Sequence, residues 1–227
     1  MKNDGGRLTL NGAGSYTGGT TINGGVLVAG QADALGVTGT IAVNAGATFA
    51  VGQGVTFTRE VTLNAEATLA GGGVYSIGHT VTFANTRHVG PGLSIGTLTL
   101  ADEAVFQAGS FLDIELGGAL AGEYDHLVAQ QALSLEGGTL NVTLYGGFSP
   151  AGGEVFDILD WGSLSGAFDA VSLPALASGL LWDDSNLYTT GELLVRAEQA
   201  APEIPEPASA VLLASGAAAL ALRRRRR

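Results

Sequence analysis

The sequence contains no cysteine, and charged residues occupy only 14% of its 227 positions. Without cysteine the chain has no disulfide, no thiolate metal site and no cysteine nucleophile, so packing and backbone hydrogen bonds must hold the fold. Aromatic residues are also few, at 7%, but hydrophobic residues reach 46%, the usual share for a globular protein. We therefore expect a packed core rather than wholesale disorder.

Basic residues are scarce outside the last five positions. Lys2 is the sole lysine, and residues 1–222 hold five basic residues against 21 acidic ones, a net charge of −16. A surface of this sign repels phosphate backbones. The sequence therefore predicts no nucleic-acid partner, and it favours a location outside the cell or on its surface, or weak collection of divalent cations.

The C-terminus combines three segments in order. A proline-rich linker, 198–207, favours an extended and accessible chain, and it ends in the motif Pro205, Glu206 and Pro207. Residues 208–222 carry no charge, and as a helix they would be about 22 Å long against roughly 30 Å of bilayer hydrocarbon. A basic stop follows, formed by Arg223, Arg224, Arg225, Arg226 and Arg227. Because basic residues stay in the cytoplasm, the sequence predicts a short hydrophobic C-terminal helix that is a transient transmembrane anchor at 208–227.

These three segments resemble the PEP-CTERM sorting signal of Gram-negative bacteria. The resemblance implies an exosortase as partner, which recognises the signal in the inner membrane, cuts near the Pro-Glu-Pro motif and releases the protein to the cell surface or the medium. The alternative is a buried alanine-rich helix with an arginine tail. Since no signal peptide follows Met1, we expect Met1 to be an internal or misassigned start of a longer exported protein; otherwise the protein is cytoplasmic and its tail has no sorting role.

Residues 5–197 are dominated by short segments with one apolar face, such as Leu8–Leu10, Val61–Leu63 and Leu112–Leu116, separated by glycine pairs. This alternation predicts strands, and the glycines predict tight turns. The strand centres step by about 14 to 21 residues, wider than the 8 to 12 or so of a sandwich. The spacing favours an all-β parallel β-helix, or β-solenoid, with two or three strands in each coil.

Residues 6–27 include Tyr16-Thr17-Gly18-Gly19-Thr20-Thr21 followed by Ile22-Asn23-Gly24. This segment resembles the autotransporter-associated β-strand repeat, which implies a right-handed parallel β-helix of the kind found in surface passengers. We expect a glycine-rich solenoid over 1–122, with the repeat near 6–30, and a β-rich continuation that caps it over 123–197.

Parallel β-helices also host polysaccharide lyases and glycosidases, so paired carboxylates need attention. The candidate pairs are Asp113 with Glu115, Asp157 with Asp160, and Asp183 with Asp184. Two carboxylates on one strand face, about 5 to 9 Å apart, can act as acid and base. We favour the interpretation that all three pairs are solvated strand or turn residues, with a weak calcium loop as the alternative for the last pair.

The histidines are His79, His88 and His126, which lie too far apart in the sequence to predict a metal trio. We interpret His126 and its neighbour Asp125 as a structural pair. The chain also lacks a nucleophile elbow and a phosphate-binding loop. The sequence therefore predicts no catalytic residue, no cofactor and no metal.

Taken together, these features predict a non-enzymatic, exported protein of the cell surface or of a biofilm-associated extracellular matrix. Its predicted partners are an exosortase, the inner membrane during anchoring, and either exopolysaccharide or other copies of itself. The alternatives are a carbohydrate-active β-helix enzyme and an adhesin-like fragment of an autotransporter passenger.

Overall fold

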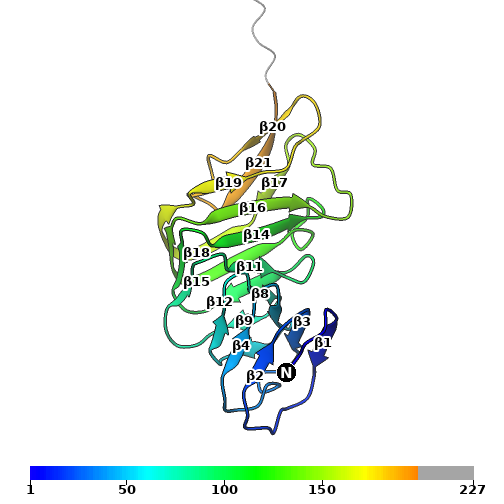
Figure 1. Ribbon diagram of the computed structural model, residues 1–227. Helices are drawn as coiled ribbons and strands as arrows, with labels where there is room; N and C mark the ends of the chain where they lie inside the picture. The colour runs from blue at the N-terminus through cyan, green and yellow to red at the C-terminus, as the bar shows by residue number, and fades with distance from the viewer. Residues whose placement is uncertain (199–227) are drawn as a thin grey trace, which may run out of the picture. The chain divides into compact units, whose positions relative to one another are not determined.

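The computed structural model describes residues 1–198, and in these residues every regular element is a β-strand (Figure 1). Contacts separate a first compact unit, Met1–Ala197, from the residues after it. Within the described part there is no helix of the length and apolarity needed to cross a membrane. The helix predicted at 208–227 lies outside the described residues, as do the Pro-Glu-Pro motif and the basic stop.

Three parallel sheets and one antiparallel sheet make up the first unit. The first sheet has eight strands, in the order β1 (Arg7–Leu10), β3 (Val26–Ala29), β5 (Thr48–Val51), β8 (Thr68–Gly71), β11 (His88–Pro91), β14 (Phe111–Leu116), β16 (Thr139–Leu144) and β19 (Ala170–Ser172). The second runs β10 (Val81–Phe83), β13 (Ala104–Gln107), β15 (His126–Glu136), β12 (Thr97–Leu100), β9 (Val74–Tyr75) and β6 (Thr56–Phe57), and β18 (Leu159–Ala167) also pairs with β15. The third holds β2 (Thr20–Ile22), β4 (Ile41–Val43) and β7 (Val61–Leu63), and the antiparallel sheet holds β17 (Val155–Asp157), β21 (Glu192–Ala197) and β20 (Leu180–Asp183).

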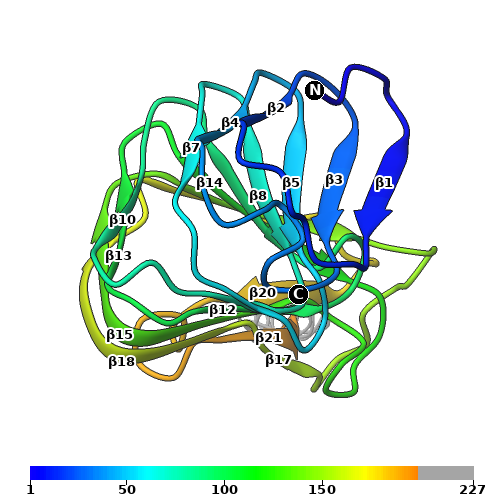
Figure 2. The same ribbon diagram turned by 90° about the horizontal axis from the view of Figure 1, so that it is seen from below.

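Strands that neighbour each other in the first sheet come from successive passages of the chain around the stack, which we call coils. Thr48 pairs with Val26, Thr68 with Thr48, and His88 with Thr68, always in parallel. Figure 2 shows β1, β3, β5 and β8 side by side on one face of the stack, with β12, β15 and β18 on another. The predicted all-β class is confirmed, and parallel strands in stacked sheets are consistent with the expected solenoid.

Four asparagines hydrogen-bond in succession along the first coils as an asparagine ladder, and their spacing gives the number of residues in each coil. The side-chain amide of Asn23 donates to Asn3 over 2.7 Å, Asn44 donates to Asn23 over 2.6 Å, and Asn64 donates to Asn44 over 2.6 Å. The steps are 20, 21 and 20 residues. One coil therefore takes about 20 residues here, and the same turn position is asparagine each time because its amide can both donate to one neighbour and accept from the other.

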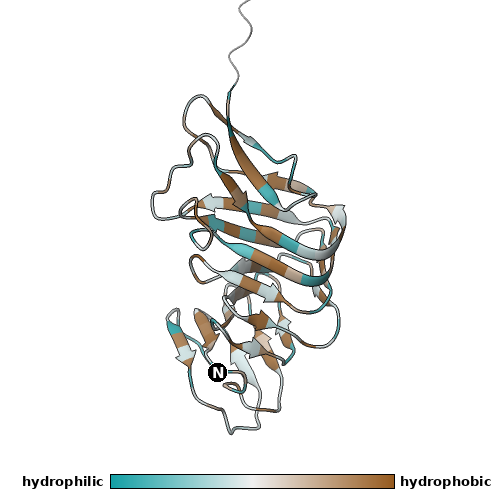
Figure 3. Ribbon diagram, turned by 180° about the vertical axis from the view of Figure 1, so that it is seen from behind, coloured by the Kyte–Doolittle hydropathy of each residue, from teal (hydrophilic) through white to brown (hydrophobic). Residues whose placement is uncertain are grey.

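The core lies inside the coils. Strand residues alternate between buried apolar side chains and half-buried or exposed ones, as in β14, and Figure 3 shows this alternation along the strands. Phe49 and Phe57 are fully buried with ring centroids 4.9 Å apart, and Phe83 and Phe106 repeat the arrangement at 5.0 Å. Aromatic pairs at these separations add to the stabilisation from burial.

The coils lengthen toward the end of the unit. Partners in neighbouring coils are 28 residues apart at Asp113 and Asn141, and 31 residues apart at Ser134 and Ser165. The 11-residue strand β15 pairs along one half with β12 and along the other with β13, and its register with β18 shifts between Ala129 and Ala132. The predicted boundary at 122 and 123 falls between β14 and β15, and the first and second sheets both contain strands from either side of it.

The third sheet stops at β7, and the next strand along the chain on that side, β10, pairs with β13 instead. A cavity of about 200 Å³ lies between these strands, lined by Val61, Leu63, Val81 and Phe83 among others. The Tyr75 hydroxyl, buried at this place, accepts the Val61 N–H over 3.0 Å. Burial raises the pKa of Tyr75 to about 12.

We expect Tyr75→Phe to lower the free energy of unfolding by about 1–3 kcal/mol, because the buried Val61 N–H loses its acceptor. The pKa of Tyr75 also predicts that the stability of the unaltered protein falls between about pH 10 and pH 12, where the unfolded chain loses this proton and the folded chain keeps it. Denaturant unfolding of both proteins across this pH range measures both effects. Tyr145→Phe, at a position 45% exposed, is the matched control, and equal losses in the two variants would contradict the assignment.

Candidate functional site

Asp113 of the first predicted carboxylate pair belongs to a ladder across three coils. His88 Nδ1 on β11 lies 2.6 Å from Asp113 Oδ2 on β14, and the Asn141 amide on β16 donates to Asp113 Oδ1 over 3.1 Å. The His88 ring stacks on Phe111 with centroids 4.6 Å apart. Both oxygens of Asp113 therefore have partners, while its predicted partner Glu115 is half-buried two residues along the same strand.

Asp125 and His126 do not form the predicted structural pair, because they direct their side chains to different partners. Asp125 is 2% exposed and accepts the backbone N–H groups of Gly96 and Glu115, each over 2.9 Å. Burial raises its pKa to about 8, against the lowering effect of those two hydrogen bonds. Asp125 therefore joins the backbones of two neighbouring segments, while the adjacent His126 belongs to a different cluster.

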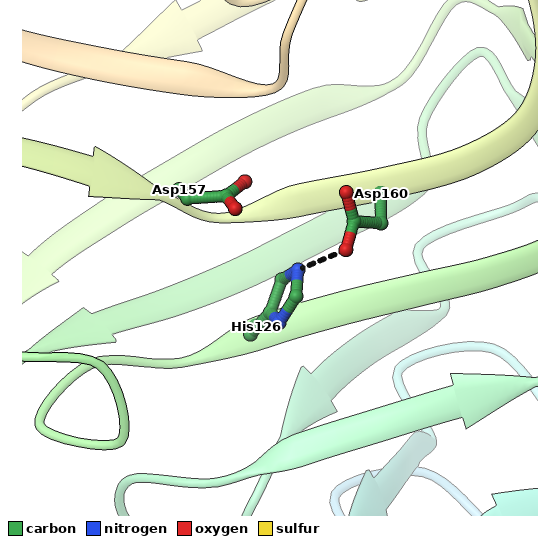
Figure 4. A group of neighbouring side chains, drawn as sticks. All are labelled: His126, Asp157 and Asp160. Carbon is green, nitrogen blue, oxygen red and sulfur yellow. Dashed lines mark ion pairs between the residues drawn. The ribbon is translucent and has the colours of Figure 1, made fainter.

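His126, Asp157 and Asp160 form the one cluster among residues 1–198 in which three metal-ligating side chains converge, with one ligand atom from each lying within 4.8 Å of the others. Figure 4 shows the two carboxylates facing each other beside the imidazole ring. His126 Nε2 lies 3.2 Å from Asp160 Oδ2, yet this contact lacks hydrogen-bond geometry, so the buried Nε2 atom has no hydrogen-bond partner. The same is true of Asp157 Oδ1.

The surroundings of Asp157 disfavour its charge. Burial raises the pKa of Asp157 above its usual range, the negative charge of Asp160 raises it further, and His126 acts in the opposite direction. Glu192 stands opposite Asp157 in the pairing of β17 with β21 and also raises this pKa. The cluster therefore concentrates negative charge around one imidazole.

Three structural elements build this cluster. His126 begins β15, Asp157 ends β17, and Asp160 lies on β18, which runs beside β15. The sequence indicated that Asp157 and Asp160 are solvated turn or surface residues, and it did not connect them with His126. The only sequence signal is the short spacing of the two aspartates, since the partner of His126 depends on a coil length that the sequence does not display.

The remaining predicted site residues lie apart from the cluster. Asp183 pairs with Arg196 and accepts the Ser185 N–H over 3.0 Å, and these contacts with Ser185 and Arg196 lower its pKa. The carbonyl of Asp184 accepts the Leu187 N–H over 3.0 Å. His79 is exposed on a loop, with Nδ1 3.2 Å from the Thr80 carbonyl. Asp183 is thus the last residue of β20, and Asp184 lies between this strand and the turn at 185–190 rather than within the predicted turn.

The first coil is held by the sole lysine. Lys2 is 7% exposed, and its ammonium group donates to Asp4 Oδ1 over 2.6 Å, to the Asp4 carbonyl over 2.7 Å and to the Gly24 carbonyl over 3.0 Å. The backbone of Lys2 also bridges to β2, donating to Thr21 and accepting from Asn23. These contacts join residues 1–4 to the strands of the predicted repeat.

Two family models match the chain, one near each end. Residues 2–29 match the passenger-associated transport repeat, and residues 203–227 match the PEP-CTERM protein-sorting motif. The chain carries a PEP-CTERM sorting motif. No curated protein matches the sequence.

The two matches confirm both predicted resemblances. The PEP-CTERM motif implies an exported protein that is transiently anchored in a membrane and processed by an exosortase. The passenger repeat coincides with β1, β2 and β3 and with the contacts of Lys2. The chain therefore combines a surface-passenger type of coil with a sorting signal.

Replacing Lys2 by Met keeps the aliphatic stem but removes all three ammonium hydrogen bonds. We expect faster amide hydrogen exchange in residues 2–29, with unchanged exchange in β15 and β18, because only the first coil depends on this group. Hydrogen exchange followed by mass spectrometry measures the difference, and Lys2→Arg is the control that keeps the charge. Equal protection in the unaltered and Lys2→Met proteins would show that the first coil does not need the ammonium group.

Proposed function

We propose that this protein is a non-enzymatic component of the cell surface or of a biofilm-associated extracellular matrix. In this proposal the body is a right-handed parallel β-helix, displayed after an exosortase has cut the chain near Pro205, Glu206 and Pro207. The observation that carries the proposal is the sorting motif at 203–227, which follows a compact body of stacked parallel strands over Met1–Ala197. Crossovers between parallel strands are right-handed in nearly all proteins, which supports the handedness.

The construction of the body suits display outside the cell. Backbone hydrogen bonds run from coil to coil along the eight-stranded sheet, and the asparagine ladder adds side-chain bonds in the same direction. Such a stack is rigid without disulfides, which this cysteine-free chain cannot form. Rigidity at a surface is useful for a protein whose task is to hold exposed polar side chains in place for polysaccharide or for other copies.

The state of Asp113 supports a non-enzymatic role. A glycosidase of the common type needs one carboxyl group to give a proton and a second to act as base or nucleophile. Both oxygens of Asp113 are engaged by His88 and Asn141, so this residue is suited to join neighbouring coils. The carbohydrate-active alternative would have to use other residues.

The edge of β1 supports self-association. The Gly6 and Leu10 carbonyls accept N–H groups of Val26 and Gly30, over 3.1 and 2.9 Å, and so face β3. Because alternate residues of a strand direct their backbone groups to opposite sides, Thr9 directs its N–H away from β3. Among residues 1–198 no strand pairs with that side of β1, and an unpaired strand edge is a template for another chain.

Thr9→Pro removes the N–H on this open edge, so we expect it to weaken association between copies of the chain at high protein concentration. Thr9→Val keeps the N–H and is the matched control. Sedimentation velocity over a concentration series measures the assembly state, and circular dichroism checks that both variants fold. Self-association through β1 is excluded if the unaltered protein stays monomeric, or if Thr9→Pro assembles as the control does.

The sorting role is tested by intact mass and location in a host with and without an exosortase. We expect loss of roughly the last 20 residues, together with appearance of the body at the surface or in the medium, only when the enzyme is present. Replacing Pro205, Glu206 and Pro207 by Ala should abolish both effects, whereas Glu198→Ala, outside the matched residues 203–227, should leave them unchanged. An intact tail and a cytoplasmic protein in both hosts would refute the proposed function.

A further inference from the structure

We propose that His126, Asp157 and Asp160 bind one divalent transition-metal cation, of the Zn²⁺ class, and that this cation fastens the antiparallel end sheet to the parallel coils. The proposal is independent of the sorting function, because all its residues lie in the body and none in the sorting motif at 203–227. It reverses the expectation from sequence that the chain holds no metal site.

The geometry of the three ligand atoms fits a small cation. One nitrogen and two carboxylate oxygens lie within 4.8 Å of one another. A tetrahedral zinc ion has ligands about 2.0–2.2 Å away, which places neighbouring ligand atoms about 3.3–3.6 Å apart. His126 Nε2 and Asp160 Oδ2 are 3.2 Å apart already, so rotation of the aspartate side chains would bring the three ligand atoms to these separations.

The cluster also contains two buried polar atoms that form no hydrogen bond within residues 1–198. His126 Nε2 and Asp157 Oδ1 are both inaccessible to solvent and have no hydrogen-bond partner. A buried polar atom without a partner is costly, and in native proteins it calls for an explanation. A cation between these two atoms would satisfy both, and Figure 4 shows the imidazole and the two carboxylates converging on one place.

The chemistry of the donors selects the class of cation. Imidazole nitrogen is a good ligand for zinc and the neighbouring transition metals, whereas calcium and magnesium prefer sites made of oxygen ligands only. Two carboxylates neutralise the charge of a divalent ion, and Glu192 opposite Asp157 adds to the negative field. Glu192 itself accepts hydrogen bonds from Asn186 and Thr190, over 3.2 and 2.8 Å, which makes it a supporting residue of the site.

The position of the site gives the cation a structural role. His126 belongs to β15 and Asp160 to β18, both in the second parallel sheet, while Asp157 belongs to β17 in the antiparallel sheet. A metal bound to all three would join two sheets that have different strand directions. In a protein without disulfides, such a bond is a means of fixing the last sheet to the stack.

The test is metal titration of the full chain, made without a histidine tag and treated with EDTA. We expect one Zn²⁺ per chain by calorimetry and a higher melting temperature with Zn²⁺ than with EDTA, with Ca²⁺ giving a much smaller shift. His126→Gln, Asp157→Asn and Asp160→Asn should each weaken Zn²⁺ binding by at least tenfold. His79→Gln and Asp184→Asn make the same chemical changes at residues outside the cluster and should leave the affinity unchanged.

Melting in EDTA separates a ligand from a merely structural residue. We expect Asp157→Asn to melt in EDTA at the same or a higher temperature than the unaltered chain, because it removes one of two crowded carboxylates, and yet to lose the zinc-dependent rise. Asp160 has a side chain 55% exposed, so Asp160→Asn keeps the fold intact and answers the question if another variant unfolds. The proposal is overturned if Asp160→Asn binds Zn²⁺ as tightly as the unaltered chain, or if binding disappears in His79→Gln instead.

Discussion

The parallel sheets depend on one constraint, which is that each coil hydrogen-bonds to the coil before it, mostly in register. Val26, Thr48, Thr68 and His88 occupy equivalent places in four successive strands. A position that points inward in one coil therefore points inward in the next, and a turn that needs a polar cap needs it again one coil later. The asparagine ladder follows directly, since Asn23 and Asn44 occupy the same turn position on neighbouring coils and their side chains hydrogen-bond to each other.

The same register brings chemistry together from distant parts of the sequence. His88, Asp113 and Asn141 are separated by 25 and 28 residues and still form one continuous ladder. His126 and Asp160 meet in the same way, because β15 and β18 are neighbours in the second sheet. In such a fold polar side chains can be brought together without a long loop, because residues on two neighbouring strands already lie side by side. Whether a cluster becomes a ladder or a ligand site depends on how completely its atoms are satisfied, and here the two clusters differ.

The strands were predictable because their signal is local. Leu8–Leu10, Val61–Leu63 and Leu112–Leu116 alternate in a way that depends only on neighbouring residues, and each lies within a strand of the structure. The lengthening of the coils was not predictable, because the register shift in β15 between Ala129 and Ala132 and the length of β18 come from packing against neighbours. Without the coil length, the contact of His126 with Asp160 cannot be found, and adjacency in sequence favours the wrong partner, Asp125. The inward side chain of Asp125 instead meets backbone N–H groups.

The antiparallel sheet is the part of the body that directly precedes the sorting motif in the chain. β21 ends at Ala197, a few residues before the sorting motif begins, so any pull on the tail during anchoring and cutting first reaches this strand. β21 is held by β17 and β20, with Arg196 paired to Asp183. From β17 the connection to the stack passes through the short segment from Asp157 to Asp160. A cation held by these two residues and His126 would strengthen one of the connections between the antiparallel sheet and the parallel coils, and it would do so most in a metal-containing medium outside the cell, where the finished protein is expected to act.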